Sequence, residues 1–326
     1  MAEISELLQP WWRQQLGEEM VTRRAFAIRE VIKGADELEL NKIEDVVLEN
    51  WLAAYDEFAD WFIHLACLFH LAPNTDSRMV DEKWLAFSVA IGAIVNQMIA
   101  VRRLVTAGLD MPAKQIVRCL VEYIDLAVRM TLDDAVRADF RRYDDIEGSG
   151  TLWKTHLRTK DRKNKTPVRD LAFAEIAKNL DADRLEVWKD FRNREDAVLH
   201  ACIHPSFIAA RMATLGDYPR NEKEIAGWMP CLGLVSRFSS RTLSYTTMAM
   251  LDYVMMGYVP DWEALPESVR SHPALQQVLC HLYEGRGLLI RLADHLINHQ
   301  YGASLSDPPD AEEEGEESPS RLRECC

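Results

Sequence analysis

Apolar residues recur along this chain at the three- and four-residue spacing of amphipathic helices, and no strand-like alternation extends beyond a few residues. Glycine and proline are scarce, at 14 and 13 of 326 residues, which favours long helices joined by short connections. The pattern therefore predicts an all-α protein. The expected helices are 3–33, 43–71, 81–107, 112–131, 133–143, 168–179, 183–204, 222–257 and 273–301.

Proline and glycine mark the expected ends of several helices. Pro73-Asn74 should end the helix at 43–71, because proline cannot donate a backbone hydrogen bond. Gly148-Ser149-Gly150 should form a loop. His204 precedes Pro205, and the residue before a proline is pushed out of the α region, so the helix at 183–204 should stop there.

Residues 84–101 contain no charged side chain, which requires a choice between a membrane span and a core helix. The segment is only marginally long enough to cross a bilayer. It also contains the polar residues Ser88, Asn96 and Gln97. We therefore predict a buried core helix and no membrane span.

The acidic composition limits any contact with nucleic acid to a local patch. The net charge is −14, and residues 304–326 are predicted to be a disordered acidic tail. Residues 153–170 are basic, with seven Lys and Arg against two Asp. A solvated connection and an RNA-phosphate contact both remain open for this segment. The expected RNA-binding residues are Arg158, Lys160, Arg162, Lys163 and Lys165.

The seven cysteines favour a reducing compartment. Their number is odd and none forms a Cys-x-x-Cys pair, which predicts free, mostly buried thiols. The N-terminus is acidic and amphipathic and does not resemble a signal peptide. We expect a cytoplasmic protein.

The helix at 112–131 carries a narrow polar strip on an otherwise apolar surface. Arg118, Glu122, Asp125 and Arg129 lie at i, i+4, i+7 and i+11, which places them along one line. One interpretation is a thin solvated face with i, i+4 ion pairs. The other is a charged strip facing a cleft, where Glu122 would hold Arg118 as an anion-binding group.

The helix at 183–204 repeats this arrangement. The expected apolar face consists of Val187, Phe191, Val198 and Cys202. The expected polar line consists of Lys189, Asn193, Asp196, His200 and His204. A solvated face would account for this polar line. A role of the two histidines in proton transfer would account for it too, because imidazole exchanges protons near neutral pH. The two histidines have the spacing of helical metal ligands, but no third ligand is identified, so no metal is predicted.

Two motifs resemble a family of bacterial helical proteins. The first motif lies in residues 99–130 and consists of Gly108, Ala113 and the Arg-x-x-x-Glu pair Arg118 and Glu122. The second motif, about eighty residues later, is His204-Pro205-Ser206. The resemblance covers roughly residues 85–210. This family is similar to HEPN domains, which are helical bundles common in toxin–antitoxin and phage-defence systems. Arg194 and His200 also match the Arg-x(4–6)-His spacing of HEPN ribonucleases.

The resemblance implies a metal-independent ribonuclease without a cofactor. His204 or His200 would remove the proton from an RNA 2′-hydroxyl, and Arg118 or Arg194 would stabilise the phosphate. Glu122 would hold Arg118. The expected partners are RNA, a protein partner or antitoxin, and a second copy of the chain. The alternative function is a catalytically inert protein-interaction module.

The resemblance also gives a predicted domain division. Residues 1–78 would form an N-terminal helical region and 79–212 a HEPN-like helical core. Residues 213–303 would form C-terminal helices packed on this core, followed by the tail at 304–326.

Overall fold

The described part of the chain is built from helices alone, which confirms the predicted all-α class. The computed structural model describes residues 46–106, 109–142, 146–157, 182–203 and 237–298, together with residues 8, 10, 12–14, 174, 177 and 178. The longer helices are α5 (Val46–Thr75), α6 (Glu82–Thr106), α7 (Asp110–Leu132), α11 (Ala182–Cys202), α13 (Arg237–Met256) and α15 (Pro273–Asn298). The shorter elements are η1 (Ser77–Met79), α8 (Asp134–Arg142), α9 (Ile146–Leu152), the π-helical turn η2 (Trp153–Leu157), η5 (Trp262–Ala264) and α14 (Glu267–Arg270).

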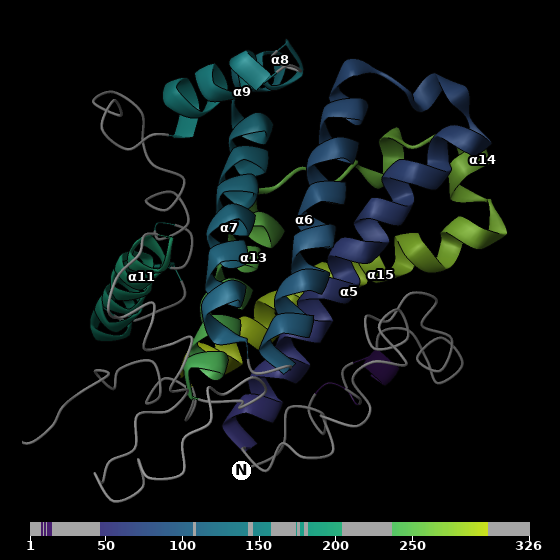
Figure 1. Cartoon of the computed structure of the whole chain (residues 1–326). Coiled ribbons are helices and arrows are strands. Elements are labelled where there is room, and N and C mark those ends of the chain that lie inside the picture. Colours follow the sequence, from purple (N-terminus) through teal and green to yellow (C-terminus); the bar gives the residue numbers. More distant parts are fainter. Residues whose placement is uncertain are drawn as a thin grey trace, which may run out of the picture.

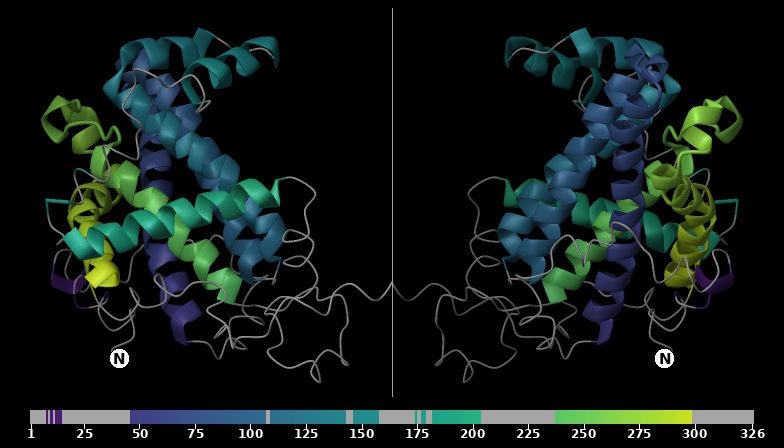
Figure 2. Two further views of the ribbon diagram at one scale, coloured as in Figure 1. Left: turned by 90° about the vertical axis from the view of Figure 1, so that its left-hand side faces the viewer. Right: turned by 90° about the vertical axis from the view of Figure 1, so that its right-hand side faces the viewer.

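Four helices form the centre of the bundle. Helix α5 packs on α6, α6 on α7, α7 on α13, and α13 back on α5. Helix α15 lies against α5 and α13, while α8 and α9 lie at one end of α7 (Figure 1). Helix α11 lies on the outside, where it crosses α7 (Figure 2). Helices of all three predicted regions contribute to a single hydrophobic cluster.

Helix α5 is buried along most of its length because it is surrounded by α6, α13 and α15. Its large aromatic side chains at the core are at most 3% exposed: Trp51, Tyr55, Phe58, Trp61, Phe62 and Phe69. Polar groups on α5 therefore need partners within the bundle. The Trp61 indole donates to the carbonyl of Leu282, at 2.9 Å.

Two predicted breaks in the helices are wrong. Helix α5 continues through Pro73 to Thr75 instead of ending at the Pro73-Asn74 pair. Residues 148–150 lie inside α9 and do not form a loop, and the helical path continues from them into the π turn η2. In both places the tertiary packing overrides the local preference of proline or glycine. The predicted helix 3–33, the segment 222–236 and the tail lie largely or wholly outside the described residues.

The way that α5 accommodates Pro73 can be traced to one side chain. A residue at position 73 would normally donate its amide hydrogen to the carbonyl of Phe69, and proline has none. The indole Nε1 of Trp84, at the start of α6, donates to that carbonyl at 2.9 Å. Trp84 is buried, so the Phe69 carbonyl is satisfied without solvent.

Trp84→Phe should lower the free energy of unfolding by about 1–3 kcal/mol, because it removes the donor to a buried carbonyl while keeping a ring. Adding Pro73→Ala should recover part of this loss, since alanine restores the amide hydrogen of the helix. Urea denaturation measures both effects. An equal loss in the single and the double variant would contradict this account of Pro73.

Helix α6 is the one helix of the described part that is long and apolar enough to cross a membrane. It nevertheless packs between α5 and α7. Its Arg102 guanidinium, which is 1% exposed, donates from Nε to the Asp56 carboxylate on α5 at 2.7 Å. The inner face of α6 is therefore a core face, as predicted.

Candidate functional site

The polar strip on α7 changes character along the helix. Arg118 and Glu122 form an ion pair of 2.8 Å, and both side chains are about one third exposed. Asp125 is half-buried, and Arg129 is buried. The strip is therefore solvated at its start, where Glu122 does hold Arg118, and enters the protein at its end.

The buried face of α11 differs from the predicted one. Phe191 and Cys202 are buried and Val198 is half-buried, but Val187 is 39% exposed, which corrects its assignment to this face. The centre of the buried face also contains Trp188 and Leu199. On the predicted polar line, Asn193 and His200 are exposed, whereas Lys189 and Asp196 are half-buried.

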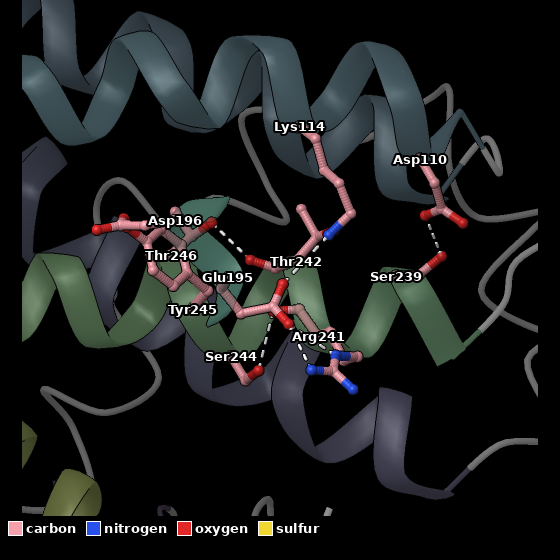
Figure 3. A network of polar contacts seen from close by, with 10 residues as sticks. All are labelled: Asp110, Lys114, Glu195, Asp196, Ser239, Arg241, Thr242, Ser244, Tyr245 and Thr246. Atoms are coloured by element: carbon pink, nitrogen blue, oxygen red, sulfur yellow. Dashed lines mark hydrogen bonds and ion pairs between the residues drawn. The ribbon is translucent and has the colours of Figure 1, made fainter. Parts of the chain in front are cut away.

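Charged side chains dock α11 onto the bundle. Figure 3 shows Glu195 of α11 between a cation from α7 and a cation from α13. The Lys114 Nζ lies 3.6 Å from one carboxylate oxygen, and the Arg241 Nη2 lies 2.6 Å from the other. Lys114 and Glu195 are at most 2% exposed. Such a buried arrangement is stable only while every charge keeps its counterion.

Three further polar contacts lie along the same helices. The Tyr245 hydroxyl on α13 donates to the Asp196 carboxylate on α11. The Ser239 hydroxyl donates to Asp110 at the start of α7, at 2.6 Å (Figure 3). Arg192 and Asp252 form an ion pair of 2.9 Å in which both side chains are 1% exposed.

The Arg192 guanidinium stays charged in this buried position. Burial alone would lower the pKa of Arg192, but the Asp252 carboxylate and its neighbours outweigh this effect and raise it. The guanidinium also lies over the rings of Trp188 and Tyr245, at 5.7 and 5.3 Å from their centroids. The Arg192–Asp252 ion pair therefore fixes α11 against α13.

The end of α11 lies beside the predicted anion-binding pair. Gln115, one turn before Arg118 on α7, donates to the carbonyl of Cys202 at 3.2 Å. His200 is exposed, on the side of α11 away from its buried face. Arg194 and His200 belong to one unbroken helix, so they point about 120° apart. His204 lies outside the described residues, as do the five predicted RNA-binding residues at 158–165.

A second polar cluster lies at the other end of α7, where the polar strip is buried. His156, on the π turn η2, is 4% exposed. Its ring nitrogen Nε2 lies 2.9 Å from the carboxylate of Asp139 on α8, whose side chain is 30% exposed. Arg129 donates from Nη1 to the backbone carbonyl of His156. Asp139 of α8 therefore holds the imidazole, and Arg129 of α7 holds the backbone of the same residue.

The contact with Asp139 sets the tautomer of His156. A carboxylate accepts hydrogen bonds, so Nε2 carries the hydrogen and the neutral ring keeps its lone pair on Nδ1. Nδ1 is buried and has no hydrogen-bond partner among the described residues. An imidazole oriented by a carboxylate, with its other nitrogen unbonded, has the arrangement of a general base.

Cysteine chemistry is disfavoured in the described part. Cys67, Cys119, Cys202 and Cys280 are free thiols, as predicted, but only Cys202 is buried and Cys119 is exposed. The expectation of mostly buried thiols is therefore wrong for these four. Burial raises the pKa of each thiol, which disfavours the reactive thiolate.

Nothing in the sequence around His156 marks it as a site residue by spacing or motif. Arg129 and His156 are 27 positions apart in the sequence, with Asp139 between them, and the turn between α7 and α8 and the path through α9 bring the three together. One feature of the sequence does point to a buried polar site at this end of α7. Arg129 continues the polar strip of α7 into a region where the helix is otherwise apolar, which indicates a buried polar partner.

Among the described residues, no three His, Cys, Asp or Glu side chains gather in a way that could hold a metal ion. No family model, curated protein or solved structure matches the chain. The similarity to HEPN-related proteins therefore stays a prediction.

Proposed function

We propose that the chain is a metal-independent ribonuclease, and that His156 is its general base. The supporting observation is the free Nδ1 of an imidazole whose Nε2 is held by Asp139. Nδ1 would take the proton from an RNA 2′-hydroxyl, and the oxygen would attack the adjacent phosphorus. The bond to the 5′-oxygen breaks, and that oxygen leaves with a proton from solvent, giving a 2′,3′-cyclic phosphate.

The charge around the turn supports a polyanionic substrate. Lys154, two residues before His156, is exposed on the same π turn. Residues 158–169 contain six further Lys and Arg. Basic side chains attract the phosphates of RNA, and Lys154 lies on the same turn as the imidazole. Short π-helical turns also occur frequently at functional sites.

Access to His156 is a testable requirement of this proposal. The imidazole is 4% exposed, so an RNA ribose reaches Nδ1 only when the π turn moves. Opening of the turn should therefore let His156 react slowly with diethyl pyrocarbonate, which modifies accessible neutral imidazoles, and bound RNA should protect it, because the ribose then occupies Nδ1. Mass spectrometry of the modified peptide, with exposed His200 as the internal reference, measures this change.

His156→Gln should reduce the rate of RNA cleavage by roughly 10²- to 10⁴-fold, the usual contribution of a general base. Glutamine keeps an N–H donor for Asp139 but cannot accept the proton, so the fold should be preserved. The assay uses labelled single-stranded RNA and bulk tRNA in EDTA. His272→Gln, an exposed histidine just before α15, is the matched control and should retain full activity.

Two further variants separate this site from the one that the sequence predicts. Loss of cleavage in Arg118→Ala and His204→Ala, with full activity in His156→Gln, would place the reaction at the end of α11. Absence of cleavage by the wild-type chain at all protein concentrations would refute the proposed activity.

A protein-interaction module remains the second candidate function, because α6 exposes large apolar side chains. Leu85 is 42% exposed and Val89 is 55% exposed on its outer face. Exposed apolar side chains that cluster on one face are typical of an interaction surface.

A further inference from the structure

The outer face of α6 carries a regular seam of seven residues. They are Glu82, Leu85, Val89, Gly92, Asn96, Ile99 and Arg103. Their spacing alternates between three and four residues, which is the heptad spacing of helices that pack along their length. Six of the seven are exposed and Ile99 is half-buried.

The fold accounts for the inner face of α6 but not for this seam. The inner face places Phe87, Ile91, Ile94 and Val101 in the core, each with no measurable exposure. The seam faces away from these side chains. A Cβ added at Gly92 would have nothing within 4 Å, so the middle of the seam is open. Solvent-facing positions of a helix are ordinarily polar, and here Leu85 and Val89 occupy two of them.

The charges at the two ends of the seam indicate its occupant. Glu82 and Arg103 lie at equal distances from the midpoint between Gly92 and Ala93. If two copies of α6 pack antiparallel about a two-fold axis at that midpoint, Glu82 of each copy faces Arg103 of the other. Parallel packing would instead place like charges opposite each other. Gly92 at the crossing point allows the two backbones to approach closely.

The exposure of the end charges fits this arrangement. The Glu82 side chain is 90% exposed, and its contact with Arg141 on α8 is a loose 3.6 Å pair. Arg103 is exposed at the opposite end of the helix. The 22 residues from Glu82 to Arg103 extend about 30 Å at the helical rise of 1.5 Å per residue, which is long enough for a continuous helix–helix contact.

We propose that the seam on α6 is an antiparallel homodimer interface. A membrane is the less suitable occupant. The seam ends in a carboxylate and a guanidinium, and the inner face of the same helix carries the buried Arg102–Asp56 ion pair.

The test is the molar mass of the full chain, measured by sedimentation equilibrium over a range of concentrations. Wild type should be a dimer, and Val89→Lys should raise the dissociation constant at least tenfold because it buries two lysines at the interface. Val187→Lys is the matched control, since Val187 is an exposed valine of α11, and it should leave the dissociation constant unchanged.

Charge reversal tests the antiparallel order. Glu82→Arg and Arg103→Glu should each weaken the dimer, and the double variant should restore it, because the two charges again face their opposites. A wild-type monomer at all concentrations would overturn the proposal. So would a dimer unaffected by Val89→Lys, or a chain that is recovered from the membrane pellet only with detergent.

Discussion

Asp252→Asn is expected to lower the free energy of unfolding by about 3–5 kcal/mol, because it leaves a buried guanidinium without its counterion. The partner Arg192 is 1% exposed and lies 2.9 Å from the Asp252 carboxylate. Asparagine has nearly the same shape, so the loss reports the charge and not a cavity. Chemical denaturation followed by far-ultraviolet circular dichroism measures it.

The matched control and the double variant separate charge from packing. Asp190→Asn changes an exposed aspartate of the same helix as Arg192 and should alter stability by no more than about 0.5 kcal/mol. Arg192→Met with Asp252→Leu removes both charges and should recover most of the loss. If Asp252→Asn and Asp190→Asn are equally stable, the buried pair does not hold α11 to α13.

Glu195→Gln should have an effect of similar size, about 3–5 kcal/mol, because Glu195 faces two cations at once. Lys114 is 1% exposed, so its ammonium group would remain buried without a negative partner. Arg241 can reach solvent more easily, since its side chain is 14% exposed. We expect the change to act first on α11, which would exchange its amide hydrogens faster than α7 or α13.

Glu186→Gln provides the comparison, because Glu186 is an exposed glutamate on the same helix. Adding Lys114→Met to Glu195→Gln should return part of the lost stability, since the unpaired ammonium is then gone. Unchanged hydrogen exchange across α11 in Glu195→Gln would show that its apolar side chains are sufficient to dock it.

The helices were predictable where a helical period continued for twenty residues or more. The expected 81–107 and 183–204 agree closely with Glu82–Thr106 and Ala182–Cys202. The exceptions lie where proline or glycine alone predicts the end of a helix. Pro73 stays helical because Trp84 supplies the missing donor, and that contact joins residues fifteen apart in the chain.

The polar contacts were less predictable than the helices. The Arg118–Glu122 pair follows from i, i+4 spacing within one helix and was foreseen. The partners of Lys114, Arg192 and His156 could not be foreseen in the same way. Lys114 and Arg192 have partners on other helices and His156 has one on α8, so these pairs follow from packing rather than periodicity. His156 falls within the basic segment 153–170, where spacing alone gives no reason to single it out.

The position of α5 has a consequence for how the chain is made. This helix comes early in the sequence, yet much of its cover comes from α13 and α15, and the Trp61–Leu282 hydrogen bond joins residues 221 apart. During synthesis its aromatic surface therefore stays partly exposed until the ribosome has produced α13 and α15, some 200 residues later. A chain that stops before α15 leaves part of that surface uncovered, so truncated forms are expected to aggregate more readily than the finished protein.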